Sequence, residues 1–182
     1  ADLGLVAWFY GDYERTVGQC RAVLALDPDF APAHHYLGLA LEQLGRLVEA
    51  IASFERAQRT ARKSALSLAA VAHAAALQGD RDQAHAVLEQ LHAIWRERYV
   101  SEYPVALIHA ALDEHSLAFA WLHRGCDSRC ETVVWALHDP RLAALRADPR
   151  FAEIRSRLHT LADAAGAEQP RTLSGGKLPG WE

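Results

Sequence analysis

The fold is decided by residues 33–45, AHHYLGLALEQLG, an apolar helical stretch that ends at a glycine. That glycine, Gly45, stands 34 residues after Gly11 and 34 residues before Gly79, and each of the three has an apolar stretch before it and a charged one after it. A period of this length fits two short antiparallel helices that reverse at the glycine, which enters the left-handed backbone region without a Cβ penalty. The sequence therefore predicts a solenoid whose helical hairpins bury their apolar faces by stacking on one another.

Other columns align on the same register. Small residues recur at two positions of each unit, where two helices must touch: Gly4, Gly38, Ala72 and Ala106, then Thr16, Ala50, Ala84 and Ala118. We expect a larger residue in each unit to fill the space that the small ones leave. These larger residues are Cys20, Phe54, Leu88 and Leu122. In the fourth unit Asp113 stands in the glycine column, where Asp adopts the left-handed conformation less readily than Gly but better than most residues.

The second unit resembles a tetratricopeptide repeat. The resemblance rests on residues 33–45 and on two later stretches, Glu49-Ala50-Ile51 and Phe54-Glu55-Arg56-Ala57. The neighbouring units follow the same pattern with more departures, so that the resemblance covers about residues 1–125. It implies an all-α fold, a right-handed superhelical solenoid of antiparallel helix hairpins, and binding of protein partners.

The segment after the repeats predicts a C-terminal helical cap. It carries Asp-Pro-Arg twice, at 139–141 and 148–150, and each copy reads as an N-cap followed by Pro in the first helical turn. An apolar stripe follows that would seal the last repeat: Leu142, Leu145, Phe151, Ile154, Leu158 and Leu161. The arginines of this basic cap are balanced by nearby acidic residues, so contact with nucleic acid is not favoured.

We predict six segments along the chain. They are a first repeat truncated at its start (1–30), a second repeat (31–64), a third (65–98), a degenerate fourth (99–130), capping helices (131–163) and a flexible tail (164–182). Residues 99–103 together with the Asp-Pro-Arg-Phe ending resemble the C-terminal solenoids of large bacterial regulators, which lie behind a winged-helix DNA-binding, kinase or cyclase domain. Since the register places Ala1 inside a hairpin, we expect this chain to belong to a longer protein.

The resemblance also implies a partner-binding groove, because the first helix of each tetratricopeptide hairpin lines the concave side. Carried over to this sequence, the groove residues are Leu5, Trp8, Phe9, His35, Leu39, Glu42, His73, Tyr103 and Leu107. This stripe is mostly apolar and lacks the Lys, Arg and Asn that clamp a terminal carboxylate in one subfamily. It predicts an apolar or helical partner segment, steered by the two histidines and the glutamate.

Catalytic and metal chemistry is not predicted. The ten histidines include no i, i+4 pair with a third ligand nearby, and no nucleophile–base order or phosphate-binding glycine loop is found. Cys126 and Cys130 are four residues apart and would share one face of a helix, which leaves a thiol switch as an alternative to buried thiols. We therefore predict no enzyme activity, no metal and no cofactor.

Composition agrees with an interaction module. Of 182 residues 51% are hydrophobic and 23% charged, the formal charge is -4, and no apolar run approaches the roughly 20 residues that span a bilayer.

The leading hypothesis is a cytoplasmic, bacterial scaffold that binds a peptide or helix in the groove. One alternative is an effector module for an N-terminal DNA-binding, kinase or cyclase domain. Another is self-association through the open N-terminal end, where Leu5, Trp8 and Phe9 lie.

Overall fold

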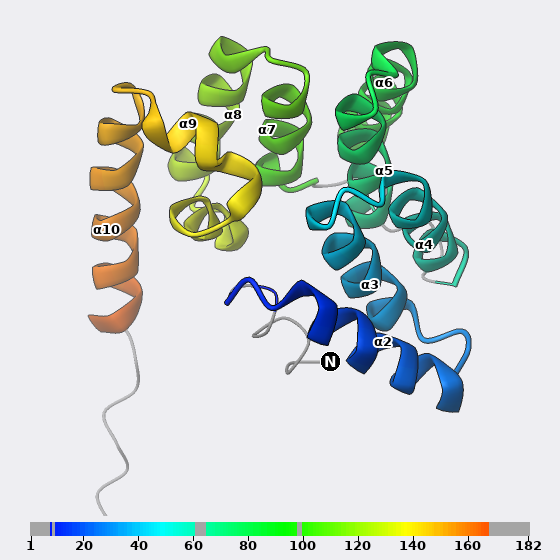
Figure 1. The fold of residues 1–182 in the computed structure, drawn as a ribbon. Coiled ribbons are helices and arrows are strands. Elements are labelled where there is room, and N and C mark those ends of the chain that lie inside the picture. The colour runs from blue at the N-terminus through cyan, green and yellow to red at the C-terminus, as the bar shows by residue number, and fades with distance from the viewer. Residues whose placement is uncertain (1–7, 9, 61–64, 98–99, 168–182) are drawn as a thin grey trace, which may run out of the picture.

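The computed structural model describes residues 8, 10–60, 65–97 and 100–167 (Figure 1). Their regular elements are helices, and no strand occurs among them. In chain order they are α2 (Tyr13–Leu26), α3 (Ala31–Gln43), α4 (Leu47–Thr60), α5 (Ala65–Leu77), α6 (Arg81–Glu97), α7 (Glu102–Ala111), α8 (His115–Asp127), the 3-10 helices η1 (Glu131–Leu137) and η2 (Pro140–Leu142), α9 (Ala143–Ala147) and α10 (Phe151–Ala167). Within these residues no helix has the length and apolar character to cross a membrane. The predicted all-α solenoid of helical hairpins is confirmed.

The turns between paired helices fall on the predicted register. Gly11, Gly45 and Gly79 have φ of 78°, 72° and 87°, and Asp113 has φ of 60°. The backbone hydrogen bonds repeat as well, because the N–H after the turn residue donates to a carbonyl five residues earlier: Arg46 to Leu41, Asp80 to Ala75 and Glu114 to His109. This is the Schellman closure of a helix C-terminus, and Asp113 adopts it in the fourth unit in place of glycine.

Two glycines test the backbone explanation, because replacement by alanine should destabilise the chain at the turn and stabilise it inside a helix. Gly45→Ala should lower the free energy of unfolding by about 1–2 kcal/mol, because its φ is left-handed although nothing lies within 4 Å of the added Cβ. Gly18→Ala, inside α2 and equally free of neighbours, should raise it by about 0.5–1 kcal/mol, since alanine is the better helix former. Urea unfolding of the two variants measures both. A loss of stability at both positions would contradict the backbone explanation.

The small residues of the register allow the two helices of a hairpin to pack closely. A Cβ built on Gly38 would lie 2.4 Å from the ring of Phe54, so α3 and α4 approach as closely as they do because position 38 has no side chain. Phe54 is fully buried, as are Ala50, Ala84 and Ala118 in the facing column. The packing predicted from the register is therefore present in this structure.

The cap closes the last hairpin. Leu142, Leu145, Phe151, Ile154 and Leu158 are buried in one cluster with core residues of α7 and α8. In both Asp-Pro-Arg copies the aspartate side chain accepts from the backbone N–H of the arginine, as predicted. The first copy opens the short helix η2, which leads directly into α9, and the second precedes α10. Helix α10 runs to Ala167, so the predicted start of the tail at 164 lies inside a helix.

Candidate functional site: a cavity on the inner face of the hairpins

A cavity of about 230 Å³ lies where the first helices of successive hairpins face the cap. Helices α3, α5 and α7 supply most of its wall, and Trp8, η1 and η2 contribute the remaining residues together with the segment before α7. Its lining residues are Trp8, His35, Tyr36, Leu39, Ala65, Leu66, Ala69, Ala70, His73, Val100, Ser101, Tyr103, Pro104, Leu107, Thr132, Trp135 and Arg141. The wall is largely apolar, with a few polar groups.

Six of the nine predicted groove residues line this cavity. They are Trp8, His35, Leu39, His73, Tyr103 and Leu107. Glu42 is buried and bonded to His73, outside the lining set. Leu5 and Phe9 lie outside the described residues. The structure thus brings together side chains that the register had assigned to one face from four different units.

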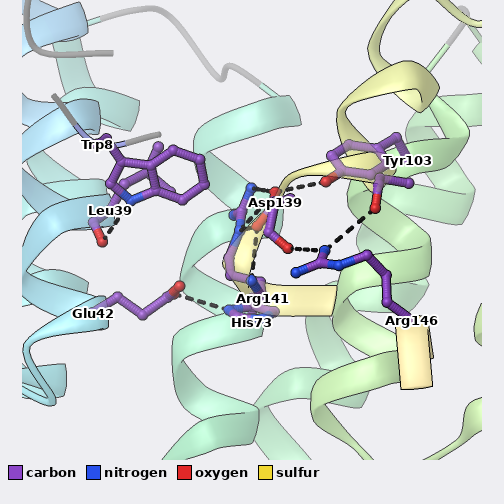
Figure 2. A network of polar contacts seen from close by, with 9 residues as sticks. Trp8, Leu39, Glu42, His73, Tyr103, Asp139, Arg141 and Arg146 are labelled. Carbon is purple, nitrogen blue, oxygen red and sulfur yellow. Dashed lines mark hydrogen bonds and ion pairs between the residues drawn. The ribbon is translucent and has the colours of Figure 1, made fainter. Parts of the chain in front are cut away.

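An ion pair from the cap is buried beside the cavity. The carboxylate of Asp139 accepts from Nε and Nη2 of Arg141, the latter at 2.6 Å, and from the hydroxyl of Tyr103 at 2.6 Å. Arg146 donates to the backbone carbonyl of the same aspartate. In the view of Figure 2, Trp8, Leu39 and Glu42 lie on one side of this pair, and Tyr103 and Arg146 on the other.

The pKa shifts follow from this burial. Burial raises the pKa of the Asp139 carboxyl, but the charge and hydrogen bonds of Arg141 and the bond from Tyr103 outweigh it, and the net pKa is lowered. Burial and the charge of Asp139 hold the pKa of Tyr103 well above its ordinary value. At neutral pH the pair is therefore ionised, while the phenol is protonated and donates.

The cap also meets the first unit. The guanidinium carbon of Arg141 lies 5.4 Å from the ring centroid of Trp8, within the range of a cation–π contact. The indole Nε1 of Trp8 donates to the carbonyl of Leu39 at 3.3 Å. Trp8, which the sequence placed on a surface for self-association, is buried against the chain's own residues.

A histidine–carboxylate pair stands next to this ion pair. Nδ1 of His73 lies 2.9 Å from Oε2 of Glu42, and the side chains are 3% and 0% exposed. Because a carboxylate only accepts, Nδ1 carries the proton, and in the neutral ring Nε2 is the acceptor. The second oxygen of Glu42, Oε1, is buried and has no hydrogen-bond partner among the described residues.

A second histidine is held neutral. Burial lowers the pKa of His35 to about 4, with a further lowering by the charge of Arg141 that exceeds the raising effect of Glu42. Its Nδ1 is buried without a hydrogen-bond partner in the described part of the chain. A buried N–H without an acceptor costs more than an unused lone pair, so the favoured tautomer carries its proton on Nε2.

Some cavity residues were not found from the sequence. Trp135 and Leu66 were not on the predicted stripe, and Arg141 was assigned to a basic cap balanced by acidic residues. Arg141 does pair with Asp139, but nothing in the sequence indicated that its side chain is only 9% exposed and lines the cavity. In the second copy of Asp-Pro-Arg, Arg150 is 49% exposed. The identical tripeptides carry no local signal that tells the two apart.

The cysteines are buried thiols. Cys126 ends up within α8 and Cys130 beyond it, after a left-handed residue at Arg129 with φ of 53°, so the expectation that the two share a helix face is wrong. Burial raises the pKa of Cys126, and that of Cys20 to about 11. Among the described residues no cluster of three or more His, Cys, Asp and Glu side chains is placed to hold a metal ion.

One comparison with known proteins agrees with the helical-hairpin architecture. Residues 31–64, which contain α3 and α4, match the family model of the tetratricopeptide repeat. A solved structure, the crystal structure of MamA, is similar over 92% of this chain and 98% of its own, with 16% sequence identity and a TM-score of 0.49. A search of curated proteins gave no match. The chain is a solenoid of helical hairpins, of which the hairpin at residues 31–64 is similar to the tetratricopeptide repeat.

Proposed function

We propose that this chain is a protein-interaction module that receives an apolar segment of a partner at the cavity. Tetratricopeptide repeats generally mediate protein–protein interactions, which supports the class of function. The observation that carries the proposal is the convergence of Trp8, Leu39, Tyr103 and Leu107, from separate helices, on one apolar cavity. These four side chains are themselves buried, and the exposed apolar surface at the cavity belongs to Leu66 and Trp135, which are 45% and 37% exposed. An apolar cavity with such a rim is where a partner segment gains from burial.

The dimensions favour a side chain or a short extended segment over a whole helix. A helix with its side chains is about 10–12 Å across, and pockets for drug-sized ligands are about 300–1,000 Å³. The cavity has about 230 Å³, and residues of the cap, Thr132, Trp135 and Arg141, form part of its wall. Trp135 also lines a neighbouring, more open hollow of about 580 Å³, onto which such a segment would continue.

The test uses two leucines of similar exposure. Leu66 lines the cavity and is 45% exposed, whereas Leu117 on α8 is 49% exposed and lies outside the lining. For peptides selected from a displayed library on the wild-type chain, Leu66→Glu should weaken binding at least about tenfold, because a carboxylate would be desolvated against an apolar segment. Leu117→Glu should leave the affinity unchanged. Titration by calorimetry measures both.

Equal peptide affinities of Leu66→Glu and Leu117→Glu would show that the cavity is not the binding site. If the selected peptides lose affinity only with Leu117→Glu, the partner binds the outer face of the solenoid. Both variants replace an exposed side chain, so their folding is checked by circular dichroism before the titration.

A second candidate is an effector module that controls another domain of a larger bacterial protein by binding a small molecule. The observation that favours it is the mixture of apolar wall and polar groups, including His35, His73 and Arg141, around a small cavity. A rise in melting temperature with a small-molecule library, absent in Leu66→Glu, would support this candidate over a peptide partner.

A further inference from the structure

We propose that the cavity recognises an uncharged amide, as an extended peptide backbone presents it, and discriminates against a carboxylate. This inference rests on the proposed function, since it names the chemistry that the same site takes. Two observations carry it. Some polar atoms at the cavity have no hydrogen bond within the described residues, and the charge of Arg141 is already paired with Asp139.

Two donors remain for a ligand. Arg141 uses Nε and Nη2 on Asp139, which leaves Nη1 without a hydrogen bond among the described residues. His35, in the tautomer that spares its buried Nδ1, presents an Nε2–H. Both side chains line the cavity. A carbonyl oxygen is the acceptor that such donors would bind.

One acceptor remains as well. Nδ1 of His73 lies 2.9 Å from the Glu42 carboxylate, so Nε2 is the ring nitrogen left for a ligand, and it presents a lone pair when the ring is neutral. His73 also lines the cavity. An N–H group is the complement to this atom. Donors together with an acceptor on an apolar wall match an amide, which carries both a C=O and an N–H.

The charges argue against a carboxylate. An arginine at a cavity is the usual partner of a carboxylate, in a two-point contact through its parallel N–H groups. Here Asp139 already occupies that position on Arg141, with both oxygens engaged. A ligand carboxylate would therefore have to be desolvated at the cavity without the two-point contact to Arg141 that normally offsets this cost.

The direct test compares two small probes of the same size. N-acetyl-phenylalanine amide should bind at least about tenfold more tightly than N-acetyl-phenylalanine, which carries a carboxylate at neutral pH. Binding is followed by NMR shifts of the indole N–H signals of Trp8 and Trp135, assigned with tryptophan-to-phenylalanine variants. Both residues line the cavity, so their signals report occupancy there.

A charge variant should reverse this preference. Asp139→Asn frees the charge of Arg141, and the carboxylate probe should then bind more tightly than the amide. The matched control is Asp148→Asn, the same change in the exposed copy of the tripeptide, which should leave the preference as in the wild type. If Asp139→Asn does not fold, His35→Phe replaces it, and the amide affinity should fall several-fold because a donor is lost.

The outcomes separate this inference from the proposed function. Carboxylate binding as tight as amide binding in the wild type overturns the inference. Failure of both probes, while selected peptides bind and lose affinity with Leu66→Glu, also overturns it and leaves the proposed function standing. If neither probes nor peptides bind, both proposals fall.

Discussion

Phe54→Ala should lower the free energy of unfolding by about 3–5 kcal/mol, among the largest effects expected for one substitution in this chain. The ring of Phe54 is fully buried and fills the space above Gly38 between α3 and α4. Removing it leaves a cavity at the centre of the best-formed repeat. Urea unfolding followed by circular dichroism measures the loss. The control is Val48→Ala on the same helix, which is 74% exposed and should change stability by less than about 0.5 kcal/mol.

A double-mutant cycle sharpens this prediction. Gly38→Ala in the wild type should cost about 1–3 kcal/mol, because its Cβ would sit 2.4 Å from the Phe54 ring. In the Phe54→Ala background the same change should cost much less, since the space is free. Additive costs would contradict the explanation that position 38 is small in order to admit the ring.

Asp139→Ala should destabilise the chain by about 3–5 kcal/mol, because it leaves Arg141 charged, buried and without its partner. The hydroxyl of Tyr103 loses its acceptor in the same step. Asp148→Ala, in the second copy of the tripeptide, should have a much smaller effect, because solvent screens the exposed pair. Equal shifts of the urea midpoint in the two variants would contradict the explanation that burial makes the first ion pair more important for stability.

The same carboxylate should make stability depend on pH. The pKa of Asp139 is lower in the folded chain than in the unfolded chain, so its contribution is complete above pH of about 4 and is lost as the pH falls through the folded-state pKa. The groups that face it are Arg141, Tyr103 and Arg146. The free energy of unfolding of the Asp139→Asn variant should fall less between neutral and acidic pH than that of the wild type. Urea unfolding at a series of pH values would measure the difference.

Much of the fold was predictable because its determinants are local. A left-handed residue after a helix, a Pro in a first turn and a period of apolar positions act within a few residues of the chain. Gly11, Gly45, Gly79 and Asp113 therefore marked four left-handed turns, whereas the left-handed residue that ends α8, Arg129, was not predicted. The assignment of His35, Leu39, His73 and Leu107 to one cavity wall also followed, since stacking of equivalent units places equivalent positions side by side.

The cap's part in the site was not predictable in this way. Asp139 and Arg141 form the same local arrangement as Asp148 and Arg150, including the backbone bond from the arginine N–H to the aspartate. Only the packing of η2 against α7 and the approach of Trp8 bury the first pair and leave the second exposed. Neither the contact of Asp139 with Tyr103 nor that of Arg141 with Trp8 follows from the 34-residue register, so they leave no periodic trace in the sequence.

The sequence by itself determined the solenoid and its register, because these depend on backbone conformation and on side-chain period. The resemblance to the tetratricopeptide repeat added the prediction of which positions share the inner face. The tertiary structure decided the chemistry of that face. It brought a buried arginine, its neutralising aspartate and two oriented histidines to one apolar cavity. Desolvation and hydrogen-bond geometry, which set the charge and the donors that a site presents, exist only when distant segments have packed together.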